Sequence, residues 1–280
     1  MHAIEINNLS KYYEDFMLEN ISLNLPSGCI MGLIGENGAG KTTIIKLILN
    51  MLQKNCGTIQ VLGKDNQENF ELTKEDIGVV LSEVGFPSYL NAMQIGKIMA
   101  KTFSNWDNNC YYSFLKMLSI PQNKKFKEFS QGMKMKLGFA VALSHHAKLL
   151  ILDEATNGLD PVVRDEITDL LLEFTRDESH SILISSHIVT DLEKICDYVA
   201  FIHKGKLMLC EEKDRLKEEY AFMICSKEEF DALDQSAVIG KRENKYGTDV
   251  IIRRDCVPLE ANISSVTLEE LFVFMVKEVK

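Results

Sequence analysis

The sequence has no long apolar run, and it has little basic charge. No uninterrupted apolar stretch among its 280 residues reaches the roughly 18 residues that cross a bilayer, which excludes a membrane-spanning helix. The opening stretch MHAIEINNLSKYYEDF is polar and carries acidic residues early, which excludes a secretory signal peptide. The net charge of −10 argues against the basic face of a nucleic-acid-binding protein, so we expect no nucleic-acid partner.

Cysteine pairs with metal-ligand spacing are also missing. The seven cysteines are scattered and odd in number, and no C-x-x-C occurs. This excludes a disulfide scaffold and a zinc site, and it predicts reduced thiols in a cytosolic protein. The composition, with 46% hydrophobic and 26% charged residues, is that of an ordinary soluble domain.

A glycine-rich segment, GENGAGKTT at 35–43, directly follows the apolar run CIMGLI. The spacing Gly35-x-x-x-x-Gly40-Lys41-Thr42 is that of a phosphate-binding loop between a buried strand and a helix. Glycines let successive backbone N–H groups point into one concavity, and the following helix adds the positive end of its dipole. We expect Lys41 to reach the terminal phosphates of a nucleoside triphosphate and the Thr42 hydroxyl to bind Mg²⁺.

The rest of the chain alternates between strand and helix patterns. Strands are expected at 3–7, 16–25, 29–34, 56–63, 77–81, 149–154, 180–186 and, around a turn at Gly205, 198–210. Helical patterns alone fill 86–147, and another follows at 161–177. This order predicts a mostly parallel sheet with an inserted helical subdomain at about 86–147.

A smaller unit is expected after residue 215. YAFMIC and DVIIRRD have the pattern of strands, and Thr267 and Glu270 have the spacing of a capping box that opens a final helix. The apolar stripe of that helix would pack in a core, with a dimer contact as the alternative. The stripe consists of Leu268, Leu271, Phe272, Met275 and Val279.

Two carboxylates stand at the end of the buried run LLILDE. Parallel α/β sheets bind ligands at the carboxyl ends of their strands, which places Asp153 and Glu154 beside the phosphate loop. Asp153 can hold Mg²⁺, and Glu154 can orient and deprotonate an attacking water. His187 follows a second buried strand and could contact the terminal phosphate, although a structural polar residue is the simpler interpretation of a lone histidine there.

Four segments occur in the order and spacing of the ATP-binding cassettes of ABC transporters. They are GENGAGKTT, FSQGMKMK (129–136), LLILDEATNGLD (149–160) and SSHIVTDLEKICD (185–197). Over roughly residues 1–215 the chain resembles that family. The resemblance implies an α/β fold with a P-loop NTPase core, an antiparallel β subdomain, the helical subdomain, and a small α+β unit at 216–280.

The resemblance also implies a set of site residues. Glu154, His187 and Lys41 would be catalytic. Ser130 and Gly132, in place of the family's signature serine and glycine, would grip ATP held by a second cassette, and Asp160 would cross toward the partner's loop. Residues expected to contact ATP are Tyr13, Gly35, Glu36, Asn37, Gly38, Ala39, Gly40, Lys41, Thr42, Thr43, Ser130, Gly132 and Asp160.

Several positions depart from the family pattern. Gln131 and Met133 replace the usual signature residues. The glutamine that normally follows the strand at 77–81 is replaced by Ser82, and we expect Glu83 to act as a substitute metal contact beside Thr42 and Asp153, with a solvated loop carboxylate as the alternative. For the aromatic residue that stacks on adenine, Tyr12 is the alternative to Tyr13.

The resemblance implies an ATPase subunit that, with ATP and Mg²⁺, drives a membrane exporter. The expected partners are a transmembrane permease and a second ATPase subunit, identical or paralogous, at the cytoplasmic face of the membrane. VTLEELFVFMV and FSQGMKMK resemble ABC-2 type export ATPases of the peptide, lantibiotic and antimicrobial export subgroup, including phenol-soluble modulin exporters. A soluble ABC ATPase and a non-catalytic ATP-sensing module remain as alternatives.

Overall fold

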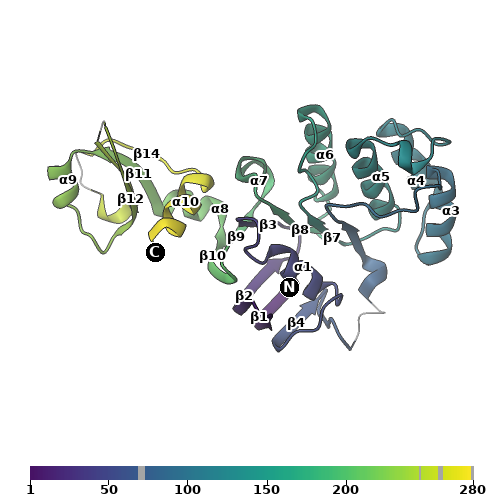
Figure 1. The fold of residues 1–280 in the computed structure, drawn as a ribbon, viewed down its shortest axis with the longest axis horizontal. Helices are drawn as coiled ribbons and strands as arrows, with labels where there is room; N and C mark the ends of the chain where they lie inside the picture. Colours follow the sequence, from purple (N-terminus) through teal and green to yellow (C-terminus); the bar gives the residue numbers. More distant parts are fainter. Residues whose placement is uncertain (69–72, 246, 258–260, 279–280) are drawn as a thin grey trace.

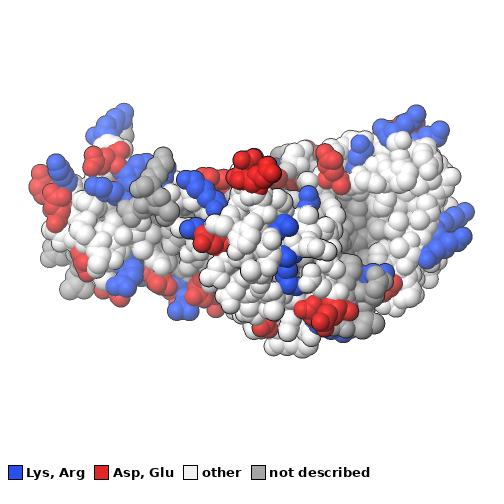
Figure 2. Space-filling model, turned by 60° about the horizontal axis from the view of Figure 1, so that its bottom comes forward, with Lys and Arg blue, Asp and Glu red and all other residues white. Residues whose placement is uncertain are grey.

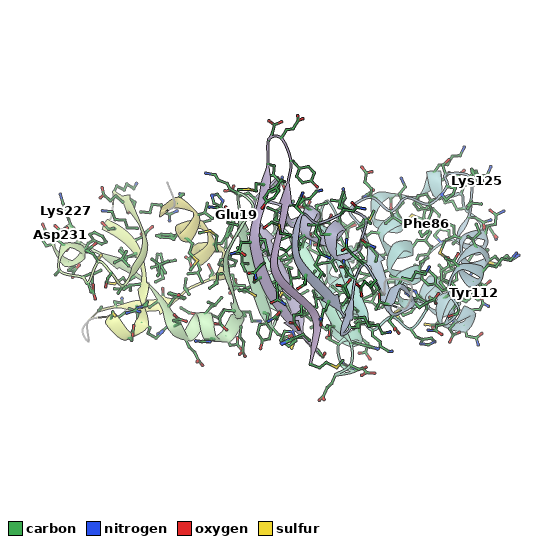
Figure 3. The ribbon with its side chains drawn as sticks, turned by 90° about the horizontal axis from the view of Figure 1, so that it is seen from below. Glu19, Phe86, Tyr112, Lys125, Lys227 and Asp231 are labelled. Atoms are coloured by element: carbon green, nitrogen blue, oxygen red, sulfur yellow. The ribbon has the colours of Figure 1, made fainter. Side chains whose placement is uncertain are left out.

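The computed structural model describes residues 1–68, 73–245, 247–257 and 261–278. The molecule is elongated, with the C-terminal sheet at one end, a helical block at the other, and the two remaining sheets packed against each other in between (Figure 1). In Figure 3, Glu19 marks the antiparallel sheet in the middle, Phe86 and Tyr112 the helical block at one end, and Lys227 and Asp231 the C-terminal unit at the other.

The central sheet has six strands in the order β10-β9-β3-β8-β7-β6. All neighbouring strands pair in parallel except β9 and β10, which form a hairpin around Gly205. The strands are β3 (Ile30–Gly35), β6 (Ile77–Val80), β7 (Leu149–Asp153), β8 (Ser181–Ser186), β9 (Tyr198–His203) and β10 (Lys206–Glu212). Every residue of β3, β7 and β8 is buried, as the continuous apolar runs predicted. The mostly parallel sheet is therefore confirmed.

Helices and a second sheet bury the two faces of the central sheet. On one face pack α5 (Gln131–Leu143), α6 (Pro161–Phe174) and α7 (Val189–Ile195). The other face meets α1 (Lys41–Ile48) and the predicted antiparallel sheet, whose order is β2-β1-β4-β5. Its strands are β1 (His2–Tyr12), β2 (Met17–Pro26), β4 (Cys56–Val61) and β5 (Lys64–Asp65).

The helical block has a core of its own. It contains α3 (Ala92–Thr102) and α4 (Asn108–Met117), which share one apolar cluster with one side of α5. Tyr111 is fully buried in this cluster, and its hydroxyl donates a 2.8 Å hydrogen bond to the carbonyl of Ala92.

Short 3-10 helices lie elsewhere along the chain as well as in this block, at Lys74–Asp76, Phe126–Glu128 and Arg254–Cys256.

The C-terminal unit is a four-stranded antiparallel sheet in the order β12-β13-β11-β14, with α10 against it. Its elements are α8 (Lys213–Glu219), β11 (Tyr220–Cys225), α9 (Lys227–Asp231), β12 (Val238–Asn244), β13 (Gly247–Arg253), β14 (Ile263–Ser265) and α10 (Leu268–Glu278). The sequence predicted β11, β13 and α10 but not β12 or β14. Because α8 spans residue 215, we propose that this helix is the junction between a domain at 1–215 and a smaller one at 216–280.

Helix α10 joins this unit to the cassette core. Its predicted capping box forms, because Thr267 N–H donates to Glu270 Oε2 at 2.9 Å and Glu270 N–H to Thr267 Oγ1 at 3.1 Å. Phe272 packs edge-on against Phe201 of β9, with 5.3 Å between ring centroids. Of the predicted stripe, Leu268, Leu271 and Phe272 are buried and Met275 is partly buried, whereas Val279 lies outside the described residues. The stripe therefore packs in the core, as predicted.

Charges of both signs are interspersed on the face shown in Figure 2, without a continuous basic patch there. Within the described ranges, no helix combines the length and the apolar character that a bilayer crossing requires.

Candidate nucleotide-binding site

A polar hollow of about 290 Å³ lies where the phosphate loop faces the carboxyl end of β7. Its lining residues are Phe16, Asn37, Gly38, Gly40, Lys41, Thr42, Thr43, Ser82, Asp153 and Glu154. A larger hollow of about 540 Å³ between α4 and α6 is lined mostly by apolar and acidic side chains, which do not suit a phosphate. The smaller hollow is therefore the candidate site.

Two glycines of the loop are needed for different reasons. Gly40 precedes α1 with φ 113°, a left-handed conformation that side-chain-bearing residues rarely adopt. Gly35 has no such angle, but a Cβ there would lie 2.4 Å from the carbonyl oxygen of Ile202 in β9. Gly35 thus allows close packing of β3 on β9, a role in the sheet that the sequence did not predict. The left-handed conformation of Gly40 lets the backbone N–H groups of the loop point into the hollow.

Lys41 is the positive charge of the hollow. It is 4% exposed, and Nζ donates hydrogen bonds to the carbonyls of Gly35 at 2.7 Å and Glu36 at 3.0 Å. Burial lowers the pKa of its ammonium group from the ordinary 10.5, and the nearby carboxylate of Glu154 opposes this shift. The two loop carbonyls therefore fix a buried cation beside the site for phosphates.

Thr42 and Asp153 meet beside Lys41. Thr42 Oγ1 donates to Asp153 Oδ2 at 2.9 Å, and Ser185 Oγ donates to Asp153 Oδ1 at 2.6 Å. Since β8 lies between β3 and β7, its serine reaches the end of β7 and holds the carboxylate toward the loop. A hydroxyl and a carboxylate are oxygen ligands of the kind that Mg²⁺ prefers, so this donor set fits that ion.

Glu154 occupies a constrained backbone position directly after β7. Its φ of 51° is left-handed, which costs a non-glycine residue about 1–2 kcal/mol. Its N–H donates to the carbonyl and the hydroxyl oxygens of Ser185, at 3.1 and 3.0 Å, and these bonds hold the turn. The side chain then lies with Oε1 3.6 Å from Lys41 Nζ and 3.7 Å from His187 Nδ1. Glu154, Lys41 and His187 are thus brought together as expected from the sequence.

The structure does not bring every expected residue into the hollow. Tyr13 is 45% exposed, and its ring lies tilted beside that of Phe16, which itself lines the hollow. Ser82 lines it too, whereas its neighbour Glu83 is exposed and is not among the lining residues.

Three further expected residues lie at helix starts outside the hollow. Ser130 caps α5, where its hydroxyl accepts from Met133 N–H at 3.3 Å, and Gly132 lies in the first turn of the same helix. Asp160 caps α6, where its carboxylate accepts from the next two N–H groups. None of the three is among the residues that line this hollow, and their expected partner is a second chain.

Sequence reasoning missed Phe16, Ser185 and Asn157. Phe16 follows Tyr13 by three residues, and its ring lies 3.0 Å from where a Cβ of Gly40 would be. Ser185 precedes His187 in the SSH segment, which was a usable signal. Asn157 lies in the segment LLILDEATNGLD, but no pattern indicated that its amide would contact Glu154 and His187.

Several known proteins resemble this chain in sequence. The family model described as "ABC transporter" matches residues 18–157. The chain is 35% identical over 210 residues to a bacitracin transport ATP-binding protein of Enterococcus faecalis, covering 74% of this chain and 68% of that one. It is 36% identical over 213 residues to a lantibiotic transport ATP-binding protein of Streptococcus pyogenes, covering 75% of this chain and 91% of that one.

The fold is that of solved cassettes. A dimeric ATP-binding cassette in a post-hydrolysis state, bound to ADP and phosphate, superposes with a TM-score of 0.67 at 20% identity and covers 75% of this chain and 98% of that one. At this identity the likeness concerns the fold alone.

Proposed function

Because the chain belongs to the ABC transporter family, as an ATP-binding protein and an ATPase coupled to transport, we propose that it binds Mg²⁺-ATP in the polar hollow and hydrolyses it with Glu154 as general base. The observation that carries this proposal is the meeting of Lys41, Glu154 and the Thr42–Asp153 pair around one hollow. A module that only senses ATP does not need a carboxylate beside the lysine ammonium group that would bind the phosphates.

The phosphates would lie on the loop, with backbone N–H groups around them and Lys41 beside the terminal group. Thr42 and Asp153 would hold Mg²⁺, which when bound neutralises charge on the phosphates. Adenine would stack on one of the two aromatic residues of the β1–β2 turn, Tyr13 or Phe16, whose ring centroids lie 6.3 Å apart.

Hydrolysis needs a positioned water and a base. Glu154 would accept a proton from water as the water oxygen attacks the γ-phosphorus and the bond to the bridging oxygen breaks, which leaves ADP and phosphate. Lys41 and the loop amides stabilise the charge that develops on the phosphate oxygens. His187, 43% exposed at its side chain, would contact the γ-phosphate from the side of β8.

A second cassette would complete the site. Ser130, Gly132 and Asp160 all start helices at positions outside the hollow of their own chain, which suits contacts with ATP and the loop of a partner. We propose such an ATP-bound dimer, with an identical or a paralogous chain, attached to a permease at the cytoplasmic face of the membrane. The helical block and the loop after Leu81 would contact that permease.

The exported substrate would be an antimicrobial peptide. This rests on the two relatives above, whose names concern bacitracin and lantibiotic transport. The test is deletion of the chain from its host, followed by complementation with the wild type or Glu154→Gln and growth against a panel of bacitracin, lantibiotics and other membrane-active peptides. Sensitisation that only the wild type reverses supports the proposal. Unchanged growth across the panel contradicts it.

Mixing two inactive variants tests whether each ATP site is built from residues of two chains. Lys41→Ala keeps Ser130, and Ser130→Tyr keeps Lys41, so a mixed dimer has one intact site. Turnover of the mixture well above that of either variant alone supports a homodimer. A mixture as inactive as its parts contradicts it.

A further inference from the structure

The side-chain amide of Asn157 lies between Glu154 and His187. Its Nδ2 is 2.7 Å from Glu154 Oε2 and 3.1 Å from His187 Nδ1. An NH₂ group has two protons, and here each has one acceptor. One amide thus contacts both the proposed base and the histidine that follows β8.

The orientation of the amide follows from the charge of Glu154. If the amide were turned around, Oδ1 would face a carboxylate oxygen at 2.7 Å with no proton between them, unless Glu154 were neutral. With Nδ2 toward Glu154, Oδ1 is buried and has no hydrogen-bond partner among the described residues. The orientation is therefore set by the two contacts of Nδ2.

This orientation decides which nitrogen of His187 carries the proton. Since Nδ2 donates to Nδ1, Nδ1 must present a lone pair, and the proton of the neutral ring is on Nε2. Glu154 Oε1, 3.7 Å from Nδ1, is too far to accept a proton from it. The ring then offers an N–H donor on its other side.

We propose that Asn157 is a positioning residue for hydrolysis, which fixes His187 as the Nε2–H tautomer and holds Glu154 in place as the base. The proposal rests on the proposed ATPase function and deepens it. A single side chain on the turn after β7 thereby couples the base to the donor that would face the γ-phosphate. The turn supports this, because Asn157 N–H donates to the carbonyl of Glu154 at 3.1 Å.

The direct test is NMR of the imidazole nitrogens in protein labelled with ¹⁵N-histidine, at about pH 8, above the ordinary histidine pKa. His187→Gln identifies the signals of His187 among the six histidines. Wild type should show the Nε2–H tautomer. Asn157→Ala should show a mixture, and the isosteric Asn157→Asp should favour Nδ1–H, because a carboxylate accepts where the amide donated. Asn123→Asp, an exposed site in the helical block, is the control of equal charge.

The proposal is overturned if His187 is the Nδ1–H tautomer in the wild type. It is also overturned if both Asn157 variants show the same tautomer as the wild type. Turnover gives the second readout. The kcat of Asn157→Ala should fall by about tenfold to a hundredfold, the range seen when a hydrogen-bond partner of a metal-ligating residue is removed. The KM for ATP should stay within about threefold of the wild-type value. An unchanged kcat overturns the catalytic part. The NMR signal is read without turnover, so a wild type that fails to hydrolyse ATP counts against the proposed function and leaves the tautomer test readable.

Discussion

Lys41 and Glu154 form an ion pair in the hollow, with Nζ 3.6 Å from Oε1. The lysine is nearly fully buried and the glutamate is partly exposed. Burial lowers the pKa of the Lys41 ammonium group, and the carboxylate of Glu154 opposes that shift. In the proposed function, a nucleoside triphosphate in this hollow would place its γ-phosphate beside the ammonium group of Lys41 and the carboxylate of Glu154.

The Thr42–Asp153 pair should make ATP binding depend on Mg²⁺. Thr42→Ala would remove one of the two proposed oxygen ligands of Mg²⁺, so we expect the gain in ATP affinity on adding Mg²⁺ to fall by about tenfold, by analogy with other perturbed metal sites. Thr42→Ser keeps the hydroxyl and should retain the gain. The measurement is titration of a fluorescent ATP analogue with MgCl₂ or EDTA. Equal Mg²⁺ dependence in wild type and Thr42→Ala would contradict the assignment.

Mutation can distinguish the contribution of Glu83 to the site from that of Ser82. Glu83 is exposed and is not among the lining residues, so Glu83→Gln should leave the Mg²⁺ dependence of hydrolysis within about twofold, the usual size of an exposed change. Ser82→Tyr should block the hollow and weaken ATP binding. A marked loss of Mg²⁺ affinity in Glu83→Gln would instead show that this carboxylate moves in as the sequence predicted.

His145 should make stability fall in mild acid. Its ring is 1% exposed, stacks on Phe103, and has its nitrogens 3.1 and 3.3 Å from the carbonyl oxygens of Ile77 and Val141. Burial lowers its pKa from the ordinary 6.5, so the unfolded chain binds the proton more readily than the folded one. The stability is fully present above about pH 6.5 and is lost as the pH falls toward the lower folded-state pKa.

Urea unfolding between about pH 5 and 8 measures this effect, with a slope of at most about 1.4 kcal/mol per pH unit from one group. His145→Gln should be less stable at neutral pH but should have a flatter profile. His146→Gln is the matched control, because His146 is the next residue in the chain and its side chain is 64% exposed. A control and a His145 variant with equal slopes would refute this origin.

The contact of Phe272 with Phe201 should hold the C-terminal unit on the cassette. Phe272→Ala should lower the free energy of unfolding by about 3 kcal/mol, the low end for a buried aromatic residue. Calorimetry should then show a lower or a split transition. Lys277→Ala, an exposed change on the same helix, should leave it unchanged. A single unshifted transition in Phe272→Ala would mean that α10 contributes little to the junction.

Local patterns predicted the strand–loop–helix of the phosphate site, because the apolar run of β3, the glycine spacing and α1 are adjacent in sequence. The same is true of Asp153 and Glu154, which end one buried run. Patterns of this kind could not reveal β12, whose segment VIGKREN is polar and short and becomes a strand by pairing with β13.

Contacts between distant segments were the other gap. Ser185 reaches Asp153 because β8 pairs with β7. Phe16 reaches Gly40 because the start of β2 lies against the turn at Gly205, whose carbonyl accepts from Glu19 N–H and whose N–H donates to the carbonyl of Ala39. The amide of Asn157 has its two partners in a turn where Glu154 takes a left-handed backbone conformation. Such roles depend on strand order and side-chain rotamers, which one sequence does not display.

The most direct measurement is phosphate release from Mg²⁺-ATP by the purified chain, wild type beside Glu154→Gln, with Glu269→Gln, an exposed glutamate on α10, as control. Removal of the proposed base should lower the rate by at least about a hundredfold, while ATP binding and the control rate persist. The variant should also accumulate as an ATP-bound dimer. Equal rates in wild type and Glu154→Gln would contradict the central claim.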